Sequence, residues 1–174
     1  MKETGILRRI DELGRIVVPK EIRKKLKIRE GDSLDIFVSD DYVILKKYSP
    51  LNDLELILSV LLDAIKRVSN ITIVVTDLTK VISSNKSEIN TNDQITEAFL
   101  ELLYPKEQIH INKSIALQIT NEYKTNQNIL IKPLVIYGDL FGSIVLFSEY
   151  ETQNIQQEFL DIIHYFCFEY LQIE

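Results

Sequence analysis

The charge of this chain changes sign near residue 50, and this change divides its 174 residues into two segments of different character. Residues 1–50 contain 12 basic and nine acidic side chains, a net charge of +3, whereas residues 51–174 contain eight and 17, a net charge of −9. The positive charge is densest in residues 1–29, with ten basic side chains against four acidic ones. A basic end on an acidic body indicates that one end meets a polyanion and the other does not. A solvated lysine-rich face would give the same charge pattern.

A domain boundary is expected at Pro50, because this proline ends a strand pattern and a helical pattern follows it. The first domain, residues 1–50, predicts strands at 5–10, 15–18, 34–38 and 42–46, turns at 11–14 and 40–41, and a helix at 20–27. A segment of this size without a metal or a disulfide is marginally stable alone, and its strands leave exposed edges. We therefore expect it to fold as a dimer with exchanged hairpins.

The second domain, residues 51–174, predicts an α+β fold. Helices are expected at 54–68, from a cap at Asn92 or Asp93 to Leu103, and at 153–171, with strands at 71–76, 81–83, 129–137 and 141–148. The last helix is apolar on two sides, which is typical of a helix buried on both. One side would meet the sheet, and the other the opening helix and a second subunit. The two terminal helices thus predict a second association surface.

The residue types exclude most catalytic and metal chemistry. The one cysteine, Cys167, can form neither an intrachain disulfide nor a cysteine zinc site, and there are only two histidines. His164 lies one helical turn from Cys167, but two ligands make no metal site, and both residues predict core packing; His110 is expected to be structural as well. No apolar run exceeds four residues, and the N-terminus lacks an apolar signal core. We expect a cytoplasmic protein with no cofactor, metal, membrane contact or enzymatic activity.

Basic residues recur between positions 8 and 29 in an arrangement that favours one shared surface. The residues concerned are Arg8, Arg9, Arg15, Lys20, Arg23, Lys24 and Lys27. The last four are three, four and seven positions apart on the expected helix and therefore share a face. The planar guanidinium of arginine donates two parallel hydrogen bonds, which suit a phosphate or the edge of a guanine. This pattern favours a DNA-binding surface.

Residues 4–23, 28–32 and 43–50 together resemble the AbrB-type swapped-hairpin DNA-binding domain. The resemblance covers nearly all of residues 1–50. The stretches 28–32 and 46–50 are similar to a branch of this family that regulates sporulation genes and carries a GAF domain after the DNA-binding domain. The order of helices and strands in residues 51–174 is compatible with a GAF-like domain.

The resemblance implies a β-barrel dimer of interleaved hairpins that grips double-stranded DNA through Arg8, Arg15 and Arg23. Lys24 occupies a position where relatives commonly carry arginine, so it keeps the charge but lacks the planar fork. Arg9 is the next candidate. The family tends to read DNA shape more than base sequence, which fits a surface of strands and loops.

The remaining candidate of the basic face is Lys20. The function implied by the resemblance is transcription regulation, by activation, repression or both. The GAF-like domain would sense a small molecule or mediate assembly, with a tetramer as the expected product.

Two other functions are compatible with parts of the chain. The swapped-hairpin fold also occurs in antitoxins, whose disordered acidic tail wraps a toxin. Residues 51–174 are acidic but carry periodic apolar stripes, which predict a folded domain that resists limited proteolysis. An enzyme in residues 51–174 is disfavoured, because no set of nucleophile and base is present.

Overall fold

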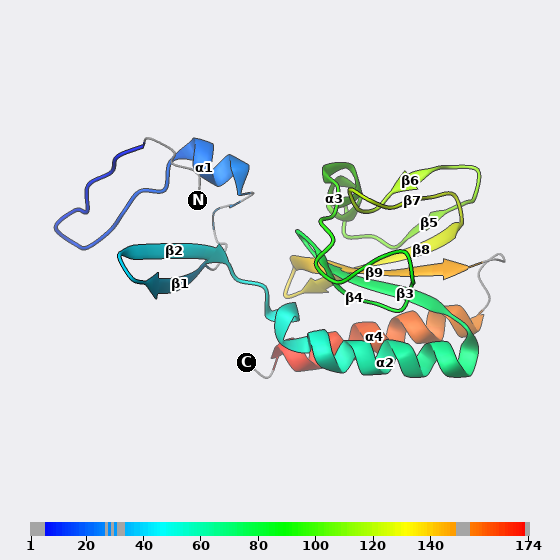
Figure 1. The fold of residues 1–174 in the computed structure, drawn as a ribbon. Coiled ribbons are helices and arrows are strands. Elements are labelled where there is room, and N and C mark those ends of the chain that lie inside the picture. The colour runs from blue at the N-terminus through cyan, green and yellow to red at the C-terminus, as the bar shows by residue number, and fades with distance from the viewer. Residues whose placement is uncertain (1–5, 27, 29, 31–33, 149–153, 173–174) are drawn as a thin grey trace. The chain divides into compact units, whose positions relative to one another are not determined.

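The computed structural model describes residues 6–26, 28, 30, 34–148 and 154–172, and Figure 1 shows the fold. The chain forms two compact units, residues 1–48 and 49–174. Three positions at which expected elements begin or end lie outside the described residues, namely Gly5, Lys27 and Gln153. Within the described ranges, no helix combines the length and the apolar character that crossing a bilayer requires.

The first unit contains a short helix and a hairpin. Helix α1 (Lys20–Lys25) follows Pro19, which is buried. Strands β1 (Leu34–Ser39) and β2 (Tyr42–Lys47) pair antiparallel along their whole length. Asp40 takes a φ of 48° in the turn between them, a conformation that aspartate tolerates better than most residues. The hairpin expected at Asp40-Asp41 is confirmed.

Residues 6–10 and 15–18, expected as strands, form no ladder in the single chain. The residues between them form the expected turn, in which the Gly14 N–H donates to the Asp11 carbonyl (2.9 Å). A strand requires a partner for its main-chain groups, and one copy of this unit supplies only the β1–β2 hairpin, which alone is marginally stable. Large apolar side chains consequently remain exposed, among them Leu7 (87%) and Val38 (77%). The described residues of one copy do not enclose a core in this unit.

The second unit is built on a five-stranded antiparallel sheet in the order β4-β3-β9-β8-β5. Its strands are β3 (Thr72–Asp77), β4 (Val81–Ser84), β5 (Ile109–Ile111), β8 (Asn128–Ile136) and β9 (Asp139–Ser148). Strands β6 (Leu117–Gln118) and β7 (Lys124–Thr125) form a separate two-stranded ribbon. The helices are the 3-10 helix η1 (Pro50–Leu54), α2 (Glu55–Ser69), α3 (Glu97–Leu103) and α4 (Asn154–Gln172).

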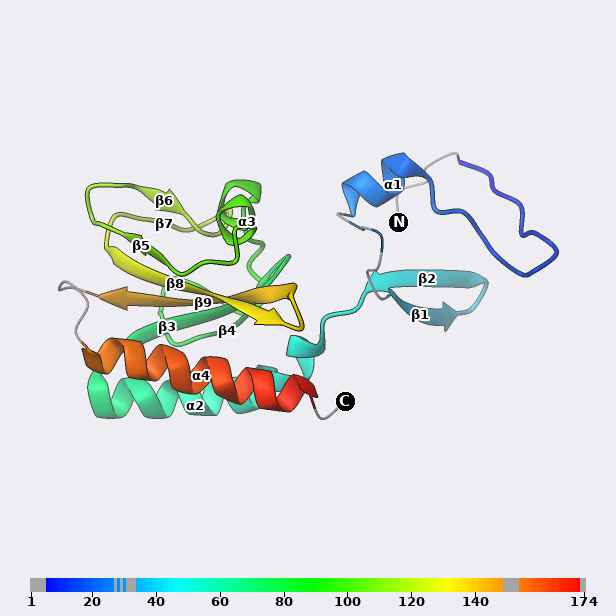
Figure 2. The same cartoon turned by 180° about the vertical axis from the view of Figure 1, so that it is seen from behind.

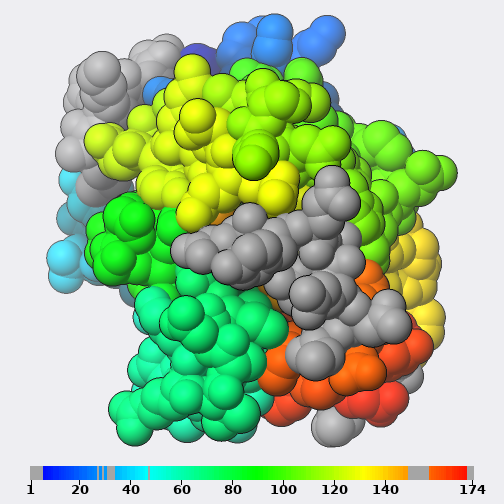
Figure 3. Space-filling view, turned by 90° about the vertical axis from the view of Figure 1, so that its right-hand side faces the viewer, coloured from blue at the N-terminus to red at the C-terminus, as the bar shows by residue number. Residues whose placement is uncertain are grey.

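Both faces of this sheet are covered. Helices α2 and α4 lie side by side against one face, and α3 with the β6–β7 ribbon covers the other (Figures 1 and 2). The helix pair buries Leu58 and Leu62 of α2 with Leu160 and Ile163 of α4, whereas Phe99 of α3 is buried on the opposite face. An end view shows α2 and α4 together on one side of the unit (Figure 3).

The topology of this unit is that of an α+β domain built on one antiparallel sheet. If the strands of the main sheet are numbered along the chain, their spatial order is 2-1-5-4-3. The first and last helices share one face of the sheet. The expected α+β fold is confirmed.

The start of α3 differs from the expectation. Thr96 caps the helix, because its hydroxyl oxygen accepts a hydrogen bond from the backbone N–H of Phe99 (3.1 Å). The cap expected at Asn92 or Asp93 is therefore wrong. These two residues instead bond to the edge of β4, since the Asn92 N–H donates to the Val81 carbonyl and the Val81 N–H donates to Asp93, both at 2.9 Å.

The β8–β9 hairpin turns at Tyr137 and Gly138, which have φ values of 49° and 87°. Gly142 lies inside β9, where a Cβ atom would overlap the carbonyl oxygen of Thr76 on β3. This glycine therefore serves the close approach of two strands, not a turn.

Asn85, directly after β4, joins α2 to the sheet. Its buried side-chain oxygen accepts a hydrogen bond from the Ile73 N–H (2.7 Å). Its amide nitrogen donates to the carbonyls of Leu62 in α2 (2.7 Å) and Ile71 (3.2 Å). Lys66 of α2 also donates to the Asn85 carbonyl. One side chain thus satisfies three main-chain groups between the helix and the sheet.

We predict that Asn85→Ala lowers the free energy of unfolding by at least about 2 kcal/mol, since each buried polar group without a partner costs about 1–3 kcal/mol. Asn121→Ala, at an exposed position, is the matched control and should change it by less than about 0.5 kcal/mol. Chemical denaturation of the full chain measures both. Equal stability of the two variants would contradict the joining role of Asn85.

Candidate nucleic-acid interface

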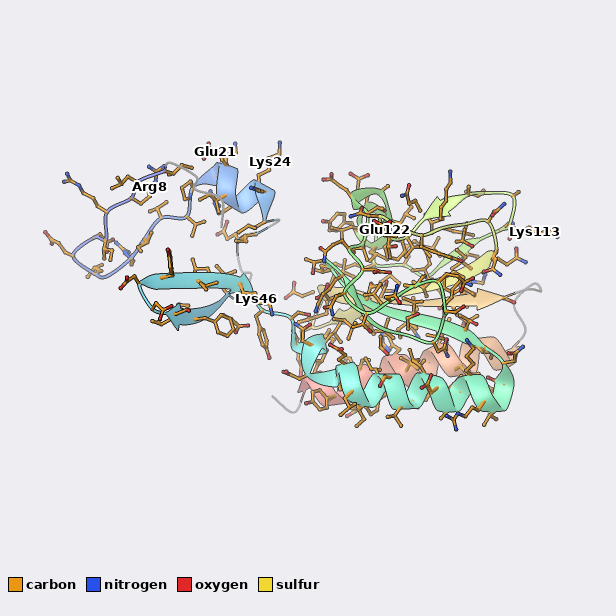
Figure 4. The ribbon with its side chains drawn as sticks, viewed as in Figure 1. Arg8, Glu21, Lys24, Lys46, Lys113 and Glu122 are labelled. Atoms are coloured by element: carbon orange, nitrogen blue, oxygen red, sulfur yellow. The ribbon has the colours of Figure 1, made fainter. Side chains whose placement is uncertain are left out.

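All six basic residues expected at the interface are described and exposed. They are Arg8, Arg9, Arg15, Lys20, Arg23 and Lys24. Arg8 and Arg9 lie before the turn at residues 11–14, Arg15 directly follows it, and the other three lie on α1. Figure 4 shows Lys24 extending from α1 on the side away from the β1–β2 hairpin. Ile22 on the same helix is half-buried, unlike the exposed Lys20, Arg23 and Lys24.

The turn before Arg15 is held by the carboxylate of Asp11. The Asp11 Oδ1 atom accepts hydrogen bonds from the backbone N–H groups of Leu13 (3.0 Å) and Arg15 (2.8 Å). The Oδ2 atom accepts from the Nε of Arg15 (2.8 Å). The backbone N–H and the guanidinium of Arg15, with the Leu13 N–H, hold the pKa of Asp11 below its ordinary value. Sequence reasoning treated Asp11 only as a turn residue, although its four-residue spacing from Arg15 is a usable signal.

The chemistry of this surface is that of anion binding. Arg8, Arg15 and Arg23 each present a guanidinium to solvent, and a guanidinium binds a phosphate or a guanine edge with two parallel hydrogen bonds. Arg8 Nη1 donates to the neighbouring Leu7 carbonyl (3.1 Å). The single chain brings Lys20, Arg23 and Lys24 together on α1. Within the described part of the first unit, the side-chain hydrogen bonds of Arg8 and Arg15 go to Leu7 and Asp11, not to that helix.

The described residues of the second unit include no comparable cluster of reactive side chains. Cys167 is fully buried between α4 and the sheet, so its expected core packing is confirmed, and burial raises the pKa of its thiol to about 12. His164 is half-buried and stacks on Phe168, with ring centroids 6.4 Å apart. Burial, and then the nearby Lys132, lower the pKa of His164. His110 lies on β5. Across the described residues, no three potential ligands come together around a metal position.

Comparison with known proteins matches each unit to a family. Residues 7–53 match the family described as antidote-toxin recognition MazE, bacterial antitoxin. Residues 53–164 match the family described as stage V sporulation protein T C-terminal, transcription factor. The chain is 36% identical to stage V sporulation protein T of Bacillus subtilis (strain 168) over 158 residues, which cover 88% of this chain and 89% of that protein.

The first unit is also similar to AbrB. It is 58% identical over 50 residues to the transition state regulatory protein AbrB of Bacillus subtilis (strain 168), which is 29% of this chain and 52% of AbrB. The chain therefore spans about half the length of AbrB. The solution structure of the N-terminal DNA recognition domain of AbrB aligns with a TM-score of 0.25 and 58% identity, over 29% of this chain and 94% of that domain.

An AbrB-like basic unit followed by an α+β unit of the matched transcription-factor family defines a class of two-domain transcription factors. Within this class, the chain belongs to the family of stage V sporulation protein T. The resemblance of residues 1–50 to the AbrB type is thus confirmed.

We predict that Cys167 does not react with a thiol reagent in the folded protein at neutral pH, because its pKa of about 12 and its burial remove both the thiolate and access to it. The measurement is colourimetric titration of the full chain with and without denaturant. Only the denatured chain should release one equivalent of product. Rapid reaction of the native protein would show that α4 separates readily from the sheet.

Proposed function

We propose that this protein is a cytoplasmic DNA-binding regulator of sporulation genes. We assign DNA binding to residues 1–50, and assembly or effector sensing to residues 51–174. The observation that best supports this proposal is the set of exposed basic side chains on the first unit. This unit is 58% identical to AbrB, a protein that recognises DNA through its N-terminal domain. No enzymatic activity is proposed.

In this proposal Arg8, Arg15 and Arg23 make the principal contacts to DNA. Their guanidinium groups reach phosphates or base edges from loops and from the short helix α1. Lys24 acts as a point charge toward the phosphates, and Arg9 and Lys20 extend the same positive surface. A surface without a long recognition helix suits readout of groove shape.

The first unit acts as a homodimer. Apolar side chains such as Leu7 and Val38 are exposed in one copy and need a partner surface that buries them. Residues 6–10 and 16–18 also form no strand ladder within one copy. A second copy that exchanges hairpins buries these side chains and supplies the strand partners.

The second unit adds a further association surface along α2 and α4. Helix α2 buries Leu58 and Leu62 toward the sheet but turns Leu56 (78% exposed) and Val60 outward. On α4, Ile162 is exposed as well. A stripe of this kind packs well against the same helices of another subunit in a four-helix bundle. If the two units choose different neighbours, the assembly closes as a tetramer with two DNA-binding dimers.

The antitoxin alternative has one supporting observation, the family matched by residues 7–53. It requires an extended tail that folds on a toxin. Residues 49–174 instead form a compact unit with a core on both faces of its sheet. The regulator is therefore the function we propose.

We predict that Arg8→Ala, Arg15→Ala and Arg23→Ala each weaken DNA binding by at least about tenfold, because a dimer loses two charged contacts per substitution. Lys113→Ala, an exposed position in the second unit, is the control and should bind like the parent. The probe is duplex DNA that the full-length protein enriches from a random pool, titrated by fluorescence anisotropy at several salt concentrations. Affinity should fall steeply with salt. Unchanged binding by all three folded variants would refute the assignment.

For the second association surface, we predict that the full chain sediments as a tetramer and that residues 1–50 sediment as a dimer. Val60→Glu should reduce the full chain to a dimer, since it places a charge in the apolar stripe of α2. Ser87→Glu, at an exposed position away from the two helices, adds the same charge and should remain tetrameric. A full-length dimer would refute the tetramer.

A further inference from the structure

We propose that Asp11 is a positioning residue for DNA recognition, whose carboxylate holds the Arg15 guanidinium in the orientation that meets DNA. This inference rests on the DNA-binding function proposed above. It adds a residue of opposite charge to the basic surface. Asp11 itself is not expected to touch DNA.

The geometry fixes Arg15 at two places. Its backbone N–H donates to Asp11 Oδ1 and its Nε donates to Asp11 Oδ2, each at 2.8 Å. The main chain closes the same loop, since the Asp11 N–H donates to the Arg15 carbonyl (3.1 Å). Gly14 permits this closure with a φ of 76°. The backbone N–H and the Nε atom of Arg15 are therefore both bonded to the carboxylate of Asp11.

The far side of the guanidinium is left for the ligand. Because Nε is engaged, the two terminal nitrogens form the outward end of the fork. The Arg15 side chain is 70% exposed in spite of its ion pair. An arginine that is already ordered loses less side-chain freedom when it binds, and its fork meets the ligand at a defined angle. Orientation of this kind favours one DNA geometry over others.

Arg15 differs in this respect from the other candidates. Among the six basic residues, and within the described part of the chain, it alone has a carboxylate partner. Arg8, among the described residues, donates to the adjacent Leu7 carbonyl. The surface thus contains one oriented guanidinium beside residues that contribute charge.

Asp11 cannot attract DNA by its own charge, because the carboxylate and the phosphates are both negative. A carboxylate on a surface that approaches phosphates opposes binding through like-charge repulsion. Residues 1–29 otherwise carry a strong excess of positive charge. Asp11 should therefore lower affinity for DNA in general and raise it for DNA whose shape fits the oriented Arg15. The affinity ratio, which is the affinity for the enriched duplex divided by the affinity for random-sequence duplex, separates positioning from a general effect on the fold.

The first test uses Asp11→Asn in the full chain. Asparagine can still accept the two turn hydrogen bonds at Oδ1, but its amide cannot accept from Arg15 Nε. We expect binding to the enriched duplex to weaken by at least about fivefold, since a dimer carries the pair twice. Binding to random-sequence duplex should stay equal or tighten, because a negative charge is removed. Glu12→Gln removes the same charge from the same exposed turn and should preserve the affinity ratio.

The second test asks whether the effect passes through Arg15. In an Arg15→Ala background, Asp11→Asn should cause no further loss of specific binding, so the two substitutions are non-additive. Asp11→Glu keeps the charge but displaces the carboxylate, and should lower the affinity ratio without tightening random-sequence binding.

The outcomes separate the two proposals. An additive loss in the Arg15→Ala background, or a preserved ratio in both Asp11 variants, would overturn the positioning role. Absence of DNA binding by the parent protein would overturn the proposed function itself.

Discussion

Apolar burial is divided unequally between the two units, and this inequality determines how the chain can work. The second unit encloses apolar clusters on both faces of its sheet, so it has the core of an independent domain. The first unit leaves Leu7, Val17 and Val38 exposed in one copy. If a second copy buries these side chains, as we propose, the symmetry of the pair would duplicate every contact to DNA. Folding and recognition would be one event in this part of the chain.

The electrostatic design of the first unit combines two kinds of residue. Most basic side chains extend into solvent and contribute long-range attraction, which does not depend on their exact orientation. Arg15 is instead tied to Asp11 by its backbone and by its side chain. The turn that carries it has few conformations, because the carboxylate satisfies two of its main-chain N–H groups. A local turn motif therefore determines how the Arg15 side chain is presented.

Much of this fold could be predicted from the sequence, and the failures have physical causes. The alternation of Leu34, Ile36 and Val38 and the tight Asp40-Asp41 turn predicted the first hairpin correctly. The strands expected at 5–10 and 15–18 depend on a partner that one chain lacks, so periodicity alone could not establish their pairing. Strands β5, β6 and β7 have two or three residues each, too few for a periodic pattern to appear. Spacing and resemblance single out the six basic residues proposed to bind DNA, whereas the hydrogen bonds of Asp11 do not follow from the sequence.

The exposed apolar residues of the first unit also bear on how the amount of protein relates to its effect. If only paired copies present a complete DNA-binding surface, the active species grows with the square of monomer concentration below the dissociation constant of the pair. A fourfold rise in expression would then raise the active dimer about sixteenfold, by this mass-action relation. Occupancy of a promoter would pass from low to high over a narrow range of protein level. The incomplete core of a single copy would thereby set a threshold for gene control.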